Sequence, residues 1–161
     1  MMQESIQRGQ SWLERLLELM GSPASVRALN LETAEGETPW LEIDDRALGV
    51  EQIENLIGDR GKTIDALQYL ANTLLNIAVE PQLQQAFTVE LNGYRLKRQA
   101  ELRALVEQVA QRVRETGTPE ELQSLSSAER RQVHNLFREY TDLTTESQGA
   151  EPHRRLVVRL S

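Results

Sequence analysis

The stretch from Leu56 to Ile64 constrains the fold more than any other part of this 161-residue chain. Gly58 and Gly61 interrupt what is otherwise a continuous helical pattern of apolar residues there. Because this pattern continues on both sides, it predicts two helices joined by a tight Gly-x-x-Gly turn. Glycine has no Cβ, so the backbone can turn sharply at both positions and a ligand can approach the main chain closely.

The second predicted helix begins directly after this turn, so its unpaired amides and the positive end of its dipole face the turn. Arg60 and Lys62 add positive charge at the same place. This combination favours an anion, and a nucleic-acid phosphate is the natural ligand. On the pattern alone, a purely structural turn is an equally good interpretation.

The Gly61-Lys62-Thr63 triplet also ends a nucleotide-binding P-loop, which is a rival interpretation. A P-loop requires a glycine five positions before Gly61, and this chain has Leu56 there. It also requires a preceding strand, whereas the residues before Gly58 follow a helical pattern. The sequence therefore disfavours an NTPase.

Composition limits the class of protein further. The apolar fraction of 39% can form a core, and the absence of cysteine excludes disulfides and thiolate metal sites. The chain has no apolar run of about 18 residues and no signal-peptide layout at its N-terminus. We therefore expect a soluble, cytoplasmic protein.

The net charge of -7 is unevenly distributed along the chain. Residues 1–55 carry 4 basic and 11 acidic side chains, residues 56–95 carry 3 and 4, and residues 96–161 carry 11 and 10. Because the local field matters more than the total charge, the C-terminal part can still present a basic face. The acidity weakens a nucleic-acid function without excluding it.

Apolar spacing and turn residues predict the order of elements in the first part of the chain. A sheet with helices packed on one face would bury all of the resulting apolar stripes. The predicted elements are a helix over 3–20, strands over 24–31 and 39–44 joined by a turn at 35–37, the two helices around the Gly-x-x-Gly turn ending near residue 77, and a strand over 87–91.

A second unit is expected to begin at residue 93, with a long helix from Tyr94 to about Thr116. Local rules leave residues 120–124 open between a helical turn and a strand. A capping box, Ser126-x-x-Glu129, then opens another helix. That helix is expected to reach about residue 140, and segments 143–147 and 154–160 predict a terminal hairpin.

The helix that follows the capping box carries a second group of candidate residues. At about 100° per residue, Arg130 and His134 lie within about 40° of each other, and the same face continues to Arg138. A histidine can stack on a base or donate to a phosphate. The alternative is a solvated face with His134 hydrogen-bonded at the core edge. The candidate strip, including arginines of the hairpin if it packs alongside, is Arg130, Arg131, His134, Arg138, Arg154, Arg155 and Arg159.

Catalysis has little support in the sequence. His134 and His153 are the only histidines, and neither is framed as a metal ligand or as a base beside a nucleophile. The Asp44-Asp45 pair is best interpreted as an exposed strand end. We therefore expect a non-enzyme with no metal site and no cofactor.

Three stretches together resemble a known family, the bacterial Jag (SpoIIIJ-associated) RNA-binding proteins. Residues 56–70, LIGDRGKTIDALQYL, resemble that family's KH domain, and residues 90–95, ELNGYR, are similar to its junction into a second domain. Residues 129–134, ERRQVH, resemble the R-three-H signature, an Arg and a His separated by three residues. The resemblance covers roughly residues 24–161 and is to a short form without the N-terminal Jag domain.

The resemblance implies an α+β fold in two domains. A type II KH domain with the element order αββααβ would occupy residues 1–92. An R-three-H domain over residues 93–161 would follow, with helices packed on a short mixed β-sheet. In that domain residues 120–124 would form a strand.

The resemblance also implies two RNA-binding surfaces. KH domains clamp about four nucleotides of single-stranded backbone at the Gly-x-x-Gly loop, with the bases on an adjacent apolar groove. Arg130 and His134 match the signature of the second surface. Asp59 departs from the family pattern by placing a carboxylate in the phosphate-binding turn, so the C-terminal half would carry more of the binding. The matching loop residues are Gly58, Asp59, Arg60, Gly61 and Lys62.

We therefore expect a non-enzymatic protein of the bacterial cytoplasm that binds single-stranded RNA, with single-stranded DNA as a secondary ligand. By similarity to the family, it would act as a post-transcriptional regulator or RNA chaperone and pair with a small single-KH-domain protein, without membrane insertion. The alternative is a protein-interaction adaptor with weak or vestigial RNA binding.

Overall fold

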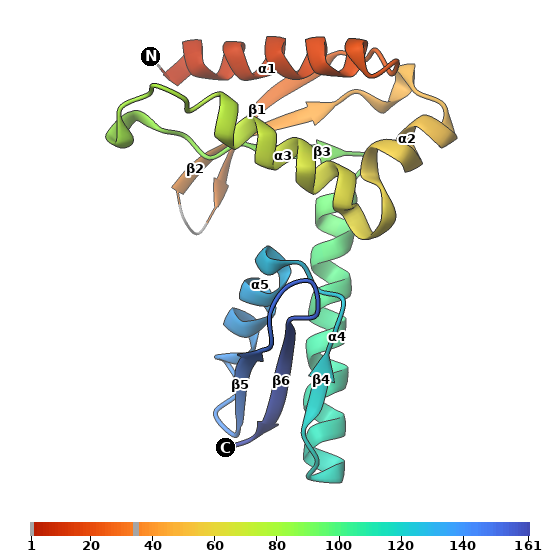
Figure 1. The fold of residues 1–161 in the computed structure, drawn as a ribbon, viewed down its shortest axis with the longest axis vertical. Helices are drawn as coiled ribbons and strands as arrows, with labels where there is room; N and C mark the ends of the chain where they lie inside the picture. The colour runs from red at the N-terminus through yellow and green to blue at the C-terminus, as the bar shows by residue number, and fades with distance from the viewer. Residues whose placement is uncertain (1, 34–35) are drawn as a thin grey trace. The chain divides into compact units, whose positions relative to one another are not determined.

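The computed structural model describes residues 2–33 and 36–161 of the chain. The chain divides into two compact units, an N-terminal unit, Met1–Arg95, and a C-terminal unit, Leu96–Ser161. Helix α4 (Tyr94–Thr116) begins in the first unit and continues in the second (Figure 1). Helices and strands occur in both units, which confirms the predicted α+β class.

The N-terminal unit is built on a three-stranded sheet in the order β1-β2-β3. Strands β1 and β2 form an antiparallel hairpin, and β2 and β3 are parallel. Two helices lie in the connection from β2 to β3, as a parallel pair requires a crossover. The elements are α1 (Met2–Leu19), β1 (Val26–Thr33), β2 (Gly36–Ile43), η1 (Asp45–Ala47), α2 (Val50–Ile57), η2 (Asp59–Gly61), α3 (Lys62–Leu74), η3 (Pro81–Leu83) and β3 (Thr88–Leu91).

The core of this unit lies between the sheet and the helices. Alternation along each strand turns Leu41 and Val89 toward the helices, where both are fully buried against Leu13 of α1 and Ile64 of α3. Figure 1 shows α1 and α3 packed over the strands. The observed order, αββααβ, is the order predicted. The apolar stripes seen in the sequence are therefore buried where they face the sheet, whereas Leu70 and Leu74 of α3 are 40% and 46% exposed.

Two boundaries in this unit differ from the sequence prediction. The hairpin strands extend further toward each other, to Thr33 and from Gly36, while part of the turn predicted at 35–37 lies outside the described residues. Helix α3 ends at Leu74 rather than near residue 77. A backbone turn follows it, in which Ala78 has a positive φ of 57° and cannot continue the helix.

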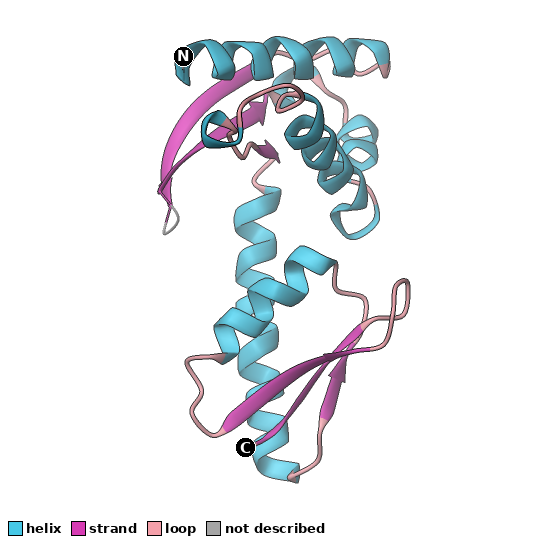
Figure 2. Ribbon diagram, turned by 60° about the vertical axis from the view of Figure 1, so that its left-hand side comes forward, coloured by secondary structure: helices cyan, strands magenta, loops and turns pink. Residues whose placement is uncertain are grey.

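The C-terminal unit packs α4 and α5 (Ser127–Phe137) with a second three-stranded sheet, whose strands are magenta in Figure 2. Its strand order is β4-β6-β5, from β4 (Glu120–Leu122), β5 (Leu143–Gln148) and β6 (Arg155–Leu160). Both strand pairs are antiparallel, so the predicted mixed sheet is wrong in this detail. The reason is that β4 runs opposite to β6, the second strand of the terminal hairpin.

Residues 120–124, which local rules left open, include a strand. Leu122 of β4 lies opposite Leu156 of β6 and is buried in the core of the C-terminal unit. Val109 of α4 and Val133 of α5 are fully buried in the same core. Pairing with β6 therefore decides the conformation of β4, not its local sequence.

Candidate nucleic-acid interface

The predicted Gly-x-x-Gly turn is a single tight turn between α2 and α3. Gly58 has φ 77° and ψ 178°, a conformation that essentially only glycine adopts. A Cβ at this position would lie 2.3 Å from Thr63 Oγ1 and 2.8 Å from Thr63 N. Helix α2 rather than a strand precedes the turn, which excludes a P-loop. The glycine is therefore required by the turn, and the first turn of α3 follows immediately.

The charged side chains of this loop are exposed. Lys62 Nζ lies 3.9 Å from Asp59 Oδ2, and both side chains are more than three-quarters exposed. An ion pair that long and that exposed contributes little to stability, so Lys62 can leave Asp59 to contact a ligand at little cost. Arg60 is also exposed, at the tip of the turn. The loop thus combines two cations and one carboxylate around the N-terminus of α3.

Arg130, the first residue of the R-three-H pattern, is buried, with 7% of its surface exposed. Its Nη1 donates to the carbonyl of Leu125 at 2.8 Å and lies 3.5 Å from the carbonyl of Arg154. Its Nη2 pairs with Glu151. The guanidinium therefore joins the segment before α5 to the loop between β5 and β6, and Arg130 is not part of an exposed strip. Helical spacing does not reveal this, because the covering loop is distant in sequence.

A pocket of about 360 Å³ lies beside Arg130, between α5 and the terminal hairpin. It brings together exposed side chains from α5 and from the residue preceding β6. Arg154 Nε donates to Ser147 Oγ at 2.8 Å, which fixes the direction of that guanidinium. We call this site the basic pocket; it comprises Arg131, His134 and Arg154, with the hydroxyls of Ser127, Thr145 and Ser147.

His134 is held in place by the neighbouring strand. Its Nδ1 lies 2.5 Å from Thr145 Oγ1. When this hydroxyl donates to Nδ1, the neutral ring carries its proton on Nε2. His134 then offers an N–H donor, and the residue is exposed to solvent. A phosphate oxygen or a nucleobase suits both properties.

The structure does not bring Arg138 and Arg155 to the basic pocket. Arg138 is exposed and caps the C-terminal end of α5, one turn beyond His134. Arg155 is the first residue of β6 and is not among the residues that line the basic pocket. Its Nε lies 3.1 Å from Glu121 Oε1 on β4. The expectation that Arg155 extends the strip is therefore wrong for this geometry.

Three hydroxyl residues of the basic pocket were not predicted. Ser127 follows the capping residue of α5, and Thr145 and Ser147 occupy alternate positions of β5. Thr145 and Ser147 lie two positions apart on a predicted strand, and this spacing indicates that both side chains lie on one face of the sheet. Nothing in the local sequence indicates that this face meets α5.

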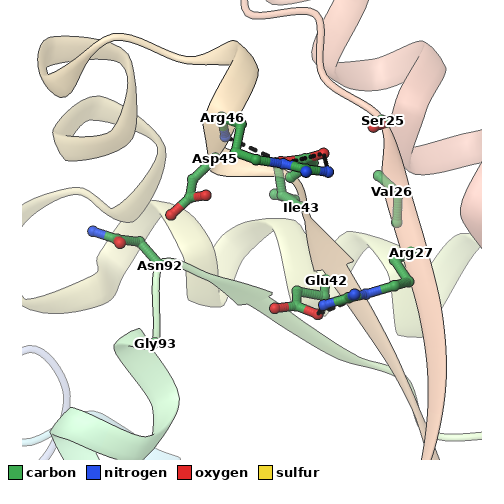
Figure 3. Close-up of a pocket in the computed structure, with 10 residues that line it drawn as sticks. Ser25, Val26, Arg27, Glu42, Ile43, Asp45, Arg46, Asn92 and Gly93 are labelled. Atoms are coloured by element: carbon green, nitrogen blue, oxygen red, sulfur yellow. Dashed lines mark hydrogen bonds and ion pairs between the residues drawn. The ribbon is translucent and has the colours of Figure 1, made fainter.

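A second pocket lies where β2 and β3 end in the N-terminal unit (Figure 3). Arg46 hydrogen-bonds Asp44 with two nitrogens, and this lowers the pKa of Asp44 to about 2. Arg27 pairs with Glu42 across the β1–β2 hairpin at 2.6 Å. The charged side chains of this pocket thus pair with one another, as the interpretation of Asp44 and Asp45 as an exposed strand end leads us to expect.

Among residues 2–33 and 36–161, no three His, Cys, Asp or Glu side chains are grouped so that they could hold a metal ion. In the same part of the chain, no helix has the length and apolar character that crossing a membrane requires.

Comparison with known proteins adds independent information. A family model for the R-three-H domain matches residues 100–160. The RNA-binding protein KhpB of Clostridium symbiosum is 28% identical over 149 residues, which cover 92% of this chain and 63% of that protein. KhpB of Lactiplantibacillus plantarum is 35% identical over 65% of this chain and 32% of its own length. KhpB of Bacillus subtilis is 34% identical over 67% of this chain and 52% of its own length. The chain thus spans less than two thirds of these curated relatives.

Proposed function

Because the chain carries an R-three-H domain and is homologous along most of its length to RNA-binding proteins of the KhpB (Jag) family, we propose that it binds single-stranded RNA. The observation that carries this proposal is the basic pocket. Two exposed guanidinium groups, Arg131 and Arg154, and the imidazole of His134 converge there. The names of the relatives describe binding proteins rather than enzymes, and we propose no catalytic activity.

In the basic pocket, charge and hydrogen bonding act on the RNA backbone together. Guanidinium groups make short, charge-assisted hydrogen bonds to phosphate oxygens, which are about twice as strong as neutral ones. The hydroxyls of Ser127 and Thr145 add neutral donors. An unstacked base can lie on the imidazole of His134, which favours single strands over duplexes. Arg130 contributes indirectly, by holding the loop that carries Arg154.

The Gly58–Gly61 loop is the second proposed contact. The amides at the start of α3 and the cations of Arg60 and Lys62 would receive a backbone phosphate. Asp59 opposes this at the same turn. We therefore propose that the N-terminal unit is a KH domain of the type II order whose loop binds more weakly than the basic pocket. Two modest sites on one chain increase the total affinity by avidity.

A binding assay with paired variants tests the proposal. The RNA affinity of Arg131→Gln and Arg154→Gln should each fall by about fivefold to tenfold, as expected for the loss of one charge-assisted contact. Arg159→Gln is the matched control, because Arg159 is an exposed arginine at alternate spacing on β6, on the sheet face of Arg155. An equal loss in all three variants, or no loss in any, contradicts a specific role for the basic pocket.

The wider role is also a proposal. By its resemblance to the Jag family, the protein would act in the cytoplasm as a post-transcriptional regulator or RNA chaperone, and would pair with a small single-KH-domain protein. Single-stranded DNA would bind more weakly than RNA, because the 2′-hydroxyl offers an additional contact.

One observation favours the alternative of a protein-interaction adaptor. Helix α3 and the turn after it expose large apolar side chains, with Tyr69 71% and Ile77 62% exposed. Exposed apolar groups grouped along one helix are typical of interaction surfaces. The adaptor interpretation replaces the RNA-binding one if the purified chain fails to bind single-stranded RNA at low salt.

A further inference from the structure

The Gly58–Gly61 loop holds a conformation that its own sequence does not enforce. Besides Gly58, Gly61 has φ 75° and ψ 14°, and Arg60 has φ 51° and ψ 34°. A left-handed conformation is unfavourable for a residue with a Cβ, such as Arg60. Such a backbone persists only when surrounding structure determines it. Contacts from outside the loop must therefore stabilise it.

Tyr94, the first residue of α4, makes the closest such contact. A Cβ built on Gly61 would lie 1.9 Å from Tyr94 Oη and 2.4 Å from Tyr94 Cζ. The phenol end of Tyr94 thus occupies the space that any side chain at residue 61 would need. Gly61 is buried under it. Only glycine fits between this ring and the left-handed turn.

Arg95, the next residue, ties the start of α4 to α3 and β3. Its Nη1 lies 2.5 Å from Asp65 Oδ1, and its Nη2 donates to Gln68 Oε1 at 3.0 Å. Its Nε donates to the carbonyl of Val89 at 3.1 Å. The guanidinium carbon lies 5.6 Å from the centroid of the Tyr94 ring, within cation–π range. One side chain therefore links β3, the first turns of α3 and the ring that covers Gly61.

Glu90 fixes the backbone of this arrangement from the end of β3. It is 5% exposed, and its carboxylate accepts hydrogen bonds from the amides of Leu91 at 2.7 Å and Arg95 at 3.1 Å. Between them, Asn92 and Gly93 both have positive φ, so the chain reverses tightly into α4. The ELNGYR stretch thus forms one rigid corner whose end packs against the loop.

We infer that Tyr94 and Arg95 are positioning residues of the Gly58–Gly61 loop, which hold it in the left-handed conformation before any ligand arrives. The inference concerns the free protein, and its importance for RNA rests on the proposed function. A preformed loop binds more tightly, because less conformational freedom is lost on binding. Tyr94 and Arg95 thereby belong functionally to the loop, although Tyr94 lies 33 positions after Gly61 in the sequence.

Amide hydrogen exchange of the RNA-free chain, residues 1–161, tests the inference. The reporters are the amides of Gly61 and Lys62, which donate to the carbonyls of Gly58 and Asp59. Tyr94→Ala should accelerate their exchange by about tenfold, and Tyr94→Phe, which keeps the ring, should restore protection. Tyr69→Ala is the matched control, because it removes an exposed tyrosine from α3 without touching the loop.

Amides of the central strand β2 distinguish a local effect from general destabilisation. Exchange that rises equally in β2 and in the loop reports global unfolding and counts against positioning. If Tyr94→Ala does not fold, Arg95→Met replaces it, since it keeps the stem and removes the contacts to Asp65, Gln68 and Val89. Loop protection unchanged in Arg95→Met overturns the inference in that case, as unchanged protection in a folded Tyr94→Ala would.

RNA affinity is measured on the same variants as a separate readout. Faster loop exchange together with about fivefold to tenfold weaker RNA binding supports the inference and the role of the loop. Faster loop exchange with unchanged affinity supports the positioning role of Tyr94 and Arg95. That result contradicts only the proposed role of the loop in RNA binding.

Discussion

Arg130 and Arg131 are adjacent in sequence, yet their surroundings give them different roles. The guanidinium of Arg130 is buried and bonded to Leu125, Arg154 and Glu151. Arg131 lies one position further around α5, exposed at the mouth of the basic pocket. The first arginine therefore shapes the site and the second is placed to contact a ligand.

We predict that substitutions at these two positions change the stability by different amounts. Arg130→Met should lower the free energy of unfolding by about 2 kcal/mol, because it removes the buried hydrogen bond to the carbonyl of Leu125, while Glu151 is already 60% exposed to water. Arg131→Gln should change stability by less than about 0.5 kcal/mol, as exposed substitutions usually do. Urea denaturation measures both. Equal stability losses would contradict the assignment of these roles.

Asp59 offers a test of the loop at single-residue resolution. Asp59→Asn removes the only carboxylate among residues 58–62 and should raise RNA affinity by about twofold to fivefold at low salt, since an exposed charge interacts modestly. The gain should disappear at high salt, where charges are screened. Affinity measured at two salt concentrations checks this, and a loss of affinity would argue against a phosphate at the loop.

For single residues, the sequence predicts where the backbone requires a particular residue better than it predicts which side chains are exposed. Gly58 was identified correctly as a residue the turn requires, since the geometry is local. The burial of Arg130 and the separation of Arg154 from Arg155 depend on how the terminal hairpin meets α5. The contacts of Arg130 with Glu151 and Arg154 join residues 21 and 24 positions apart, and no local period encodes them.

Among the secondary-structure elements, α5 shows the most direct link from sequence to structure. The predicted capping box is present: Ser126 Oγ accepts from the amide of Glu129 at 3.2 Å, and Glu129 Oε2 accepts from the amide of Ser126 at 3.0 Å. Ser126→Ala should therefore destabilise the C-terminal unit by about 1 kcal/mol. Thermal unfolding followed by circular dichroism measures this, and an unchanged midpoint would show that the box is not stabilising.

Strand β4 is an element whose conformation the local sequence does not predict. Thr118-Pro119-Glu120-Glu121 has the composition of a helix start, and local rules do not decide between a helical turn and a strand for the residues that follow. Pairing with β6 and burial of Leu122 nevertheless make residues 120–122 a strand. Tertiary pairing overrides weak local propensity in such short segments.

The pair between Arg114 at the end of α4 and Asp142 before β5 makes stability depend on pH. Two hydrogen bonds from Arg114, at 2.6 and 2.7 Å, lower the pKa of Asp142 below 3.8. A carboxyl whose pKa is lowered by folding stabilises the fold above its unfolded pKa, and this stabilisation is lost as the pH falls through the folded pKa. Asp142→Asn should therefore lower the Tm at pH 7. The difference from the wild type should shrink as the pH is taken below 3.8, and a difference that stays constant would contradict the pairing.

For the whole molecule, the distribution of charge matters more than its sum. The acidic excess lies in residues 1–55, while the basic pocket lies in a part of the chain that carries 11 basic and 10 acidic side chains. An acidic protein can therefore bind RNA where local cations converge. This distribution also agrees with a stronger contact in the C-terminal unit than at the Gly58–Gly61 loop.

The most direct test of the central claim is the salt dependence of binding to a short single-stranded RNA, with duplex DNA as the comparison. The wild type should prefer the single strand. The logarithm of its association constant should fall linearly with the logarithm of the salt concentration, with a slope of about 0.7 per phosphate contact. Arg131→Gln with Arg154→Gln, and separately Arg60→Gln with Lys62→Gln, should each reduce that slope by about 1.4, because each pair removes two contacts. Slopes that are unchanged in both double variants, or no binding at low salt, would contradict an RNA-binding protein with two phosphate sites.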